Sequence, residues 1–371
     1  MRFPEFNGEW EKKRISEFCT LLKGTGISKD QLSTNGNPCI LYGELYTKYK
    51  AEIINEVLSC TELDANTLVK SKVNDVIIPC SGETAIDIAT ARYVPFDDVL
   101  LGGDLNILRS NKVNGSFLAY QLNGKRKYDI ARVAQGVSVV HLYGEHLKNI
   151  VISLPVIEEQ QKISRLLHLL DERIATQNKI IEDLKKLKSA IRKKIFSLLK
   201  DEYTKSFEIN QLLDYEQPTA YIVANDEYST DTRLTPVLTA NKGFILGYTD
   251  EKNGIYQKGA CIIFDDFTMD AKYVSFPFKV KSSAIKILTA KPNVNLRFMF
   301  EYLSYWELKS EEHKRHYISE ISPLVIELPS KEKQNIIALL MTSLNNKLTI
   351  EEKAKIRYEV QKGYLLSQMF I

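Results

Sequence analysis

Long apolar runs are absent from this sequence of 371 residues. No stretch approaches the roughly 20 consecutive apolar residues that a membrane-spanning helix requires. The N-terminal sequence MRFPEFNGEW also lacks the charged and apolar regions of a secretory signal peptide. We therefore expect a cytoplasmic protein that has no membrane partner.

Cysteine is scarce as well. The five cysteines are odd in number, widely spaced and form no C-x-x-C pair, so they do not describe a disulfide framework. This usage is typical of a reducing compartment. Other residues predict no metal site either: Asp97, Asp98 and Asp104 lack a positioned Glu-x-Lys partner, and we interpret them as carboxylates of surface turns. His313 and His316 form an H-x-x-H pair without further zinc ligands nearby.

Catalytic motifs are equally absent. No G-x-x-x-x-G-K-[ST] loop occurs, and Gly24 and Gly26 lack the third glycine and the preceding strand of a dinucleotide-binding loop. The run from Asn37 to Ile40 shares only its Asn-Pro start with the Asn/Asp-Pro-Pro-aromatic motif of adenine methyltransferases. We expect no catalytic residue and no cofactor in this chain. The net charge of +3 is too small to indicate a class of partner.

An internal repeat is the strongest feature that the sequence does contain. The stretch 154–197 aligns without a gap with the stretch 328–371, at a constant offset of 174 positions. The residues that recur unchanged are Leu154, Pro155, Glu158, Gln160, Ile163, Leu166, Leu170, Lys179, Lys188 and Phe196. A duplication of this length fixes the organisation of the chain before any single residue is considered.

Both copies are predicted to be long helices. Apolar residues recur at steps of three and four with charged residues between them, and no Gly or Pro interrupts the first copy as far as Lys200. Pro155 is suited to the first turn of a helix, where its missing N–H costs no hydrogen bond. About 40 residues at roughly 1.5 Å each would give a rod on the order of 60 Å.

The apolar stripe of each helix requires a partner, and the stripe of the other copy matches it. Because a globular segment separates the copies, we expect an antiparallel, intramolecular coiled coil; the alternative is that each helix packs on its own domain. The second stripe is poorer, since Lys355 and Gln361 replace apolar residues and Gly363 interrupts it. The predicted core residues are Ile163, Leu166, Leu170, Ile174, Ile181, Leu184, Ile191, Ile195, Ile337, Leu340, Leu344, Leu348, Leu365 and Met369.

The two remaining segments, 1–153 and 201–327, are predicted to be globular α+β domains with mixed sheets. Short apolar runs bounded by Gly, Pro and Asn predict strands, and these runs follow the same order in both segments with weak identity. The helical segments are 154–200 and 328–371. The chain therefore alternates domain and helix in a pseudo-twofold repeat. Two diverged domains on a similar frame can each hold something different, which indicates recognition.

Three short motifs resemble those of a known family, the specificity subunits of type I restriction–modification enzymes. The helical regions of that family open with a Leu-Pro…Glu-Gln signature, which is similar to Leu154-Pro155…Glu159-Gln160. The second copy, Leu328-Pro329…Lys333-Gln334, departs from the signature because a lysine replaces the glutamate. The N-terminal Arg2-Phe3-Pro4-Glu5-Phe6 also resembles the opening of the family, and the duplicated organisation covers the whole chain.

The resemblance implies a function that the residue patterns alone do not show. Each domain would read one half of a bipartite, asymmetric site on double-stranded DNA, and the coiled coil would set the length of the unread spacer. Methyltransferase (modification) subunits and ATP-dependent restriction/translocase subunits would bind this scaffold. The chain itself would be non-catalytic, since S-adenosylmethionine, ATP and Mg would act in those partners.

DNA contacts require polar and basic side chains on loops. The candidates that we select are Ser81, Gly82, Thr84, Arg92, Lys125, Arg126, Lys127, Tyr128, Lys242, Lys272, Lys309, Lys314, Arg315, His316 and Tyr317. A plain solvated surface is the alternative for each of them. For the whole chain, the alternatives are a coiled-coil adaptor that binds only proteins, a stand-alone DNA-modifying enzyme, and a specificity subunit that has lost a partner.

Overall fold

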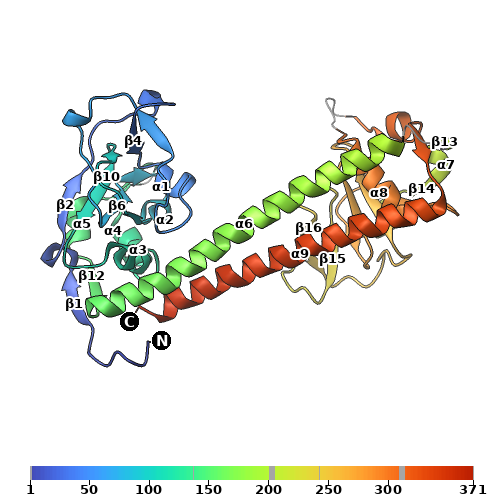
Figure 1. The fold of residues 1–371 in the computed structure, drawn as a ribbon. Helices are drawn as coiled ribbons and strands as arrows, with labels where there is room; N and C mark the ends of the chain where they lie inside the picture. Colours follow the sequence, from blue (N-terminus) through green and yellow to red (C-terminus); the bar gives the residue numbers. More distant parts are fainter. Residues whose placement is uncertain (1, 137, 200–204, 242, 309–313, 371) are drawn as a thin grey trace. The chain divides into compact units, whose positions relative to one another are not determined.

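The computed structural model describes residues 2–136, 138–199, 205–241, 243–308 and 314–370. It contains two compact units, one made of Met1–Lys179 with Glu352–Ile371 and the other of Ile180–Glu351. Each unit holds one domain and part of both long helices, α6 (Ile157–Leu199) and α9 (Lys331–Gln368) (Figure 1). The units thus cut across the helices, whereas the sequence-based boundaries follow them. In the described residues, no helix is long and apolar enough to cross a membrane.

The first domain is built around two four-stranded sheets. One is antiparallel, with the order β2 (Thr20–Lys23), β10 (Leu105–Arg109), β6 (Asp75–Pro79), β8 (Arg92–Val94). The other has the order β3 (Leu32–Ser33), β5 (Ser59–Thr61), β4 (Asn37–Ile40), β9 (Leu100–Leu101), and it is mixed because β4 and β9 are parallel. Two small pairs join β1 (Glu11–Arg14) to β12 (Val151–Leu154) and β7 (Ser81–Gly82) to β11 (Val140–His141). The helices are α1 (Glu44–Thr47), α2 (Ala85–Ile88), α3 (Gly115–Asn123), α4 (Lys127–Val133) and α5 (Gly144–Lys148), and the 3-10 turns are Ile15–Glu17, Lys29–Gln31 and Ala65–Thr67.

The second domain repeats this topology. Its antiparallel sheet has the order β14 (Leu213–Glu216), β20 (Ile285–Ala290), β17 (Cys261–Asp265), β18 (Ala271–Val274). Its mixed sheet has the order β16 (Ile245–Thr249), β15 (Thr235–Leu238), β19 (Lys279–Val280), with β15 and β19 parallel. The strand β13 (Lys205–Glu208) pairs with β21 (Val325–Leu328). The helices are α7 (Ile209–Leu212), α8 (Leu296–Tyr305), a 3-10 turn at Pro218–Tyr221 and a π turn at Tyr317–Ile321. The predicted fold class, two mixed α+β domains with two long helices, is confirmed.

The central strands are continuous apolar runs because both of their faces are covered. In β6, Val76 and Ile78 face the core that contains α3, while Ile77 faces the core under the mixed sheet. In β17, Ile262 packs toward the helices and Ile263 toward the second sheet. Alternate residues therefore serve two different cores, and a strand buried on both faces shows no apolar–polar alternation.

In the first unit, the beginning of α6 and the end of α9 complete the core of the first domain. Ile163 and Leu167 of α6 and Leu365 of α9 belong to the same apolar cluster as residues of α3. The ring of Phe370 meets that of Phe117 at 5.4 Å, edge to face. Because the start of one helix lies beside the end of the other, the two helices run antiparallel here.

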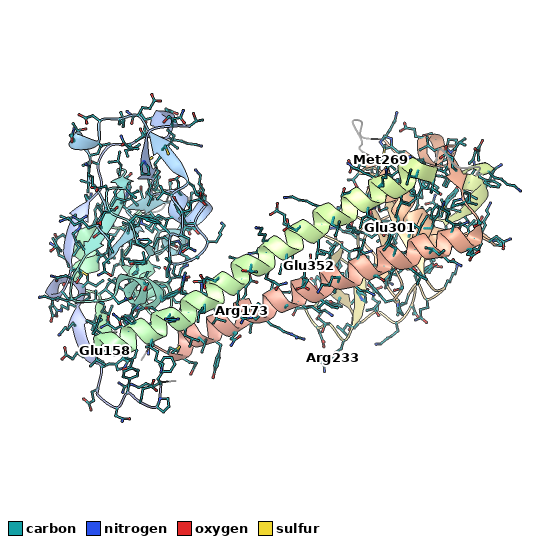
Figure 2. The ribbon with its side chains drawn as sticks, viewed as in Figure 1. Glu158, Arg173, Arg233, Met269, Glu301 and Glu352 are labelled. Carbon is teal, nitrogen blue, oxygen red and sulfur yellow. The ribbon has the colours of Figure 1, made fainter. Side chains whose placement is uncertain are left out.

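The second unit shows the reverse combination, with the end of α6 and the beginning of α9. Phe196 of α6 and Met341 of α9 lie in one cluster with residues of α8. Glu301 projects from α8 and is fully buried (Figure 2). It accepts hydrogen bonds from Arg192 at 2.6 and 3.0 Å and one from the Asn345 amide at 3.4 Å. The helices are antiparallel in this unit as well.

All the predicted core residues of the two helices are buried or half-buried except one. Leu340 is wrong, because 43% of it is exposed on the same outer face of α9 as Ile336 and Leu339, and Met341 takes the inner position. The buried members are Ile163, Leu170, Ile181, Ile337, Leu348, Leu365 and Met369, and the half-buried ones are Leu166, Ile174, Leu184, Ile191, Ile195 and Leu344. At their ends, the helices pack both on each other and on a domain. The expected helix pair and its alternative, packing on a domain, therefore occur together.

A buried ion network also connects both helices to the first domain. The Lys362 ammonium donates to Glu52 and to Asp171, and the Tyr120 hydroxyl donates to Asp171 at 2.7 Å. Burial by itself would lower the pKa of Lys362, but the two carboxylates outweigh burial and raise it. Burial raises the pKa of Tyr120 strongly, so its hydroxyl stays a donor. The network makes α9 a structural part of the first unit.

Lys362→Met should therefore destabilise the protein. Glu52 and Asp171 would remain buried without a cation, and breaking such a pair costs about 3–5 kcal/mol. Urea denaturation of the variant measures the shift. Lys355→Met is the matched control on the same helix, since Lys355 forms a half-exposed ion pair with Glu359 at 3.6 Å and its loss should cost at most about 0.5 kcal/mol. Equal midpoints for the two variants would contradict the structural role of the network.

Candidate nucleic-acid interface

The glutamine of the repeated signature fastens each domain to a long helix. The Gln160 side-chain oxygen accepts from the backbone N–H of Asn114 at 2.9 Å, and its amide donates to the carbonyl of Pro155 at 2.8 Å. Gln334 repeats the first contact with the N–H of Asn295 at 2.8 Å. Both asparagines are N-caps, of α3 and of α8. The signature thus joins the start of a domain helix to the start of a long helix.

The glutamate of the first signature has a separate role. Glu159 is fully buried and accepts two hydrogen bonds from the Arg2 guanidinium, both at 2.7 Å. Lys162 pairs with Glu5, and its ammonium lies 4.6 Å from the centre of the Phe3 ring. The N-terminal motif is therefore a strap over the first turns of α6. Two of the three motifs that carry the family resemblance, the N-terminal one and the first helical signature, are therefore in direct contact.

In the first domain, backbone hydrogen bonds bring several loops to one edge of the sheets. The N–H of Gly102 donates to the carbonyl of Ile40 at 3.0 Å, which joins the ends of β4 and β9. The N–H of Cys80 donates to the backbone carbonyl of Asp104 at 2.7 Å, and the N–H of Leu142 donates to the backbone carbonyl of Cys80 at 2.7 Å. Loops that are far apart in the sequence therefore lie side by side. We call this surface, made of residues 41–46, 80–84, 102–104 and 140–143, the first loop edge.

The second domain has the same three bonds at the equivalent places. All three acceptors are backbone carbonyls. The N–H of Lys281 donates to that of Leu238 at 3.1 Å, the N–H of Asp266 to that of Ala284 at 2.8 Å, and the N–H of His316 to that of Asp266 at 3.0 Å. The second loop edge comprises residues 239–241, 243–244, 266–270, 281–284 and 314–317. The two loop edges share a backbone scaffold while their side chains differ.

Three predicted residues of the first domain lie on its loop edge. Ser81 is buried and donates to the Asp104 carboxylate at 3.1 Å, next to Gly82. Thr84 caps α2, where its hydroxyl oxygen accepts from the N–H of Asp87 at 3.1 Å. Ser81 and Thr84 thus have structural contacts within the edge, and they stay predictions as DNA contacts.

Arg92 requires a correction. It is 7% exposed, and its guanidinium donates to the backbone carbonyls of Leu45, Tyr49 and Ala91 at 2.8–3.2 Å. Burial lowers its pKa, although the charges of nearby carboxylates oppose this. A guanidinium enclosed in this way holds α1 against β8, and it cannot reach a DNA base.

The basic run 125–128, which follows α3 and includes the start of α4, lies outside the loop edge. Lys125 is exposed, and 70% of Tyr128 is exposed. Arg126 is held by Asp129 at 3.2 Å, and burial lowers the pKa of Lys127. These residues stay predictions as DNA contacts.

In the second domain, the predicted run 314–317 lies on the loop edge. Arg315 is exposed, whereas His316 and Tyr317 are buried, and the backbone N–H of Tyr317 donates to the Asp266 carboxylate at 2.7 Å. His316 and Tyr317 therefore position the loop, and their predicted DNA contact is corrected. Lys272 is half-buried in β18, two residues after the 266–270 segment of the edge, and it stays a prediction. Lys242 and Lys309 lie outside the described residues.

The two domains hold the equivalent loop by different chemistry. In the first, the Asn106 side-chain amide donates to the carbonyl of Leu142 at 2.9 Å. In the second, Lys286 stands in place of the asparagine and pairs with Asp266 at 3.3 Å, both being 1% exposed. Lys286 also donates to Gln217 at 3.0 Å. A buried ion pair in one domain thus replaces a neutral amide in the other.

Sequence reasoning missed an aromatic group on the first loop edge. The ring of exposed His141 stacks on that of Tyr143 at 6.1 Å and 26°, and His146 meets Tyr143 edge to face at 5.8 Å. A signal was available, because Tyr143 recurs as Tyr317 at the offset of the repeat. Stacked rings on a surface suit contacts with nucleic acid.

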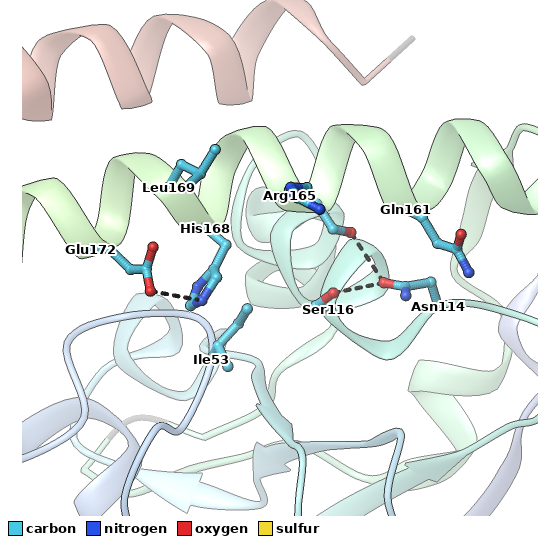
Figure 3. Close-up of a pocket in the computed structure, with 9 residues that line it drawn as sticks. Ile53, Asn114, Ser116, Gln161, Arg165, His168, Leu169 and Glu172 are labelled. Carbon is cyan, nitrogen blue, oxygen red and sulfur yellow. Dashed lines mark hydrogen bonds and ion pairs between the residues drawn. The ribbon is translucent and has the colours of Figure 1, made fainter.

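A groove of about 460 Å³ lies in the first unit between α6 and the start of α3 (Figure 3). His168 and Glu172 face it, with their polar atoms 3.6 Å apart. The hydroxyls of Ser116 and Ser164 donate to the Asn114 side chain and not to His168. The groove therefore contains no nucleophile activated by a base. Across the described part of the chain, no group of three or more His, Cys, Asp or Glu could hold a metal ion.

A duplicated domain-and-helix unit with two equivalent but chemically unlike loop edges defines a class of two-headed recognition proteins. Comparison with known families agrees with this class. The sequence model of the type I restriction modification DNA specificity domain matches residues 7–186 and 201–360. The chain belongs to this family, and it contains two such domains.

Named relatives carry the same description. The specificity subunit of the type I restriction enzyme EcoR124I/EcoR124II from Escherichia coli is 39% identical over 178 residues, which is 43% of each chain. The MjaVIII specificity subunit from Methanocaldococcus jannaschii is 28% identical over 199 residues, or 53% of this chain and 43% of the relative. The matched segments thus span less than half the length of these relatives. A crystal structure of the S subunit from M. genitalium shares the fold with a TM-score of 0.69 and 16% identity, covering 100% of this chain and 97% of that one.

The Asp266–Lys286 pair generates a prediction about the second loop edge. Asp266→Ala removes the acceptor for the Tyr317 N–H and leaves Lys286 buried without a counter-charge, which costs about 3–5 kcal/mol. Amide hydrogen exchange at 314–321 should become faster. Asp270→Ala is the control, because that carboxylate is exposed on the same turn.

Adding Lys286→Met to Asp266→Ala should recover part of the lost stability, since no uncompensated charge remains in the core. Unchanged exchange at Tyr317 in the Asp266 variant would show that the pair does not hold the loop.

Proposed function

We propose that this chain is the DNA-specificity subunit of a type I restriction–modification complex, in which each domain reads one half of a bipartite, asymmetric site. The observation that carries the proposal is the pair of loop edges, which share three backbone hydrogen bonds and differ in their side chains. Base edges are distinguished by polar side chains placed at fixed positions. A constant scaffold with variable side chains supports two readers of two different half-sites.

The long helices would set the unread spacer between the half-sites. At roughly 1.5 Å per residue, the 43 residues of α6 form a helix on the order of 65 Å. One turn of DNA is about 34–36 Å. A helix of this length is sufficient to separate readers of half-sites about one turn apart on a duplex.

Partner subunits would dock on the outer face of α9. In the second unit, Ile336, Leu339, Leu340 and Ile350 are exposed on that face by 43–68%. A row of exposed apolar side chains on a helix is typical of a protein interface. We propose that methyltransferase (modification) subunits bind there, and that ATP-dependent restriction/translocase subunits join the complex. The S-adenosylmethionine, ATP and Mg of the reactions would act in those partners.

The same exposed face supports a second candidate function, a coiled-coil adaptor that binds only proteins. The two candidates differ in their relation to DNA. A specificity subunit in its assembled complex binds duplex DNA through many phosphate contacts, so its affinity falls steeply between low and physiological salt. An adaptor has no such dependence.

Mapping of methylated adenines across the genome, with and without this gene, tests the proposal. The expected result is the loss of methylation at one bipartite motif when the gene is deleted, and its return when the gene is restored. A methylation map that does not change, in cells that contain the partner subunits, would contradict the function.

A second prediction concerns the spacer. Four residues inserted after Gln177 in α6, with four after Lys355 in α9, lengthen the helices by about 6 Å. The methylated motif should keep both half-sites and gain a longer spacer. An insertion of four residues in the exposed turn at Asn35 is the control, and it should leave the spacer unchanged. Altered half-sites after the helix insertion would refute the separation of reading from spacing.

A further inference from the structure

Residues 141 and 315 occupy equivalent positions on the two loop edges. The strands that follow, β12 and β21, start at Val151 and Val325, so the offset of the helical repeat extends back into the domains. The backbone agrees, because Leu142 and His316 make the matching hydrogen bonds in the two edges. The residue that precedes each of them is exposed: His141 in one domain and Arg315 in the other.

Most other polar groups of the second loop are already used to hold the loop itself. Lys314 and His316 both pair with Glu320, at 2.9 and 2.7 Å. The backbone N–H groups of His316 and Tyr317 bond to Asp266. Arg315 makes no hydrogen bond or ion pair with another described residue, and its side chain is exposed. Its guanidinium is therefore available to bind a ligand.

The support under this loop gives Arg315 a defined place. Asp266, which receives both backbone N–H groups, is itself buried and paired with Lys286. A side chain loses less entropy on binding when its backbone is already fixed. The guanidinium presents two parallel N–H donors, and this fork matches O6 and N7 of guanine in the major groove.

We propose that Arg315 is a specificity-determining residue that reads a guanine in the half-site of the second domain, and that His141 contacts the half-site of the first domain from the equivalent position. The inference rests on the proposed function and adds the residue and the base to it. His141 lacks the double donor of a guanidinium, so the equivalent position has different base chemistry in the two half-sites.

The test uses the full chain assembled with its methyltransferase subunits and sequencing of the methylated sites. Arg315→Lys keeps the charge and loses the fork. Discrimination against the wrong base should fall by about 5- to 150-fold at one guanine of the second half-site, with the first half-site unchanged. Arg315→Ala should relax the same position. His141→Ala should alter only the first half-site.

Lys252→Ala is the control, because Lys252 is an exposed lysine outside the second loop edge, and it should leave both half-sites unchanged. The melting temperature of each variant shows whether the fold is retained, which is expected because the Arg315 side chain is exposed. If Arg315→Lys keeps full specificity and only binding changes, Arg315 contacts a phosphate and the inference is overturned. Relaxation in the first half-site would overturn it as well. If the wild-type complex methylates no bipartite site, the proposed function itself fails, which is a separate outcome.

Discussion

Burial of one apolar stripe along two long helices is the constraint on which the structure depends. In each unit, apolar residues of both helices pack into the core of one domain. In the first unit, Leu365 of α9 belongs to the same core cluster as Ile163 and Leu167 of α6. In the second unit, Phe196 near the end of α6 and Met341 near the start of α9 belong to the core cluster of the second domain. Each domain therefore completes its core with a helix from the other copy of the repeat.

Polar contacts at the same positions specify which helix end belongs to which domain. Tyr120 and Glu301 are each six residues after the N-cap of a domain helix. Tyr120 donates to an aspartate of α6 in a network closed by Lys362 of α9, whereas Glu301 accepts from Arg192 of α6. A buried charge without its partner is costly. The buried carboxylate lies on α6 in the first unit, as Asp171, and on α8 in the second unit, as Glu301. A helix end paired with the wrong domain would leave such a carboxylate without its partner.

The sequence predicted the features that depend on spacing and repetition. The helices, the order of domains and nearly all core positions followed from an offset of 174. Gln160 was recognisable from the sequence because it recurs as Gln334 at that offset. Leu340 was misplaced because it and Met341 are adjacent, and only packing selects the inner one. Arg92 was misplaced because charge alone does not reveal an enclosed guanidinium. The loop edges could not be predicted from the sequence, since their hydrogen bonds join residues that are far apart in the chain.

Cross-linking of native lysines tests the central claim, the antiparallel pairing of α6 with α9 in one chain. The contact of Lys362 with Asp171 in the first unit places Lys355 opposite Lys179, two turns further along each helix. Mass spectrometry after treatment with a short amine-reactive reagent should find Lys179 joined to Lys355 or Lys353 within one polypeptide. Links from Lys179 to residues of its own preceding domain, with none to α9, would contradict the account.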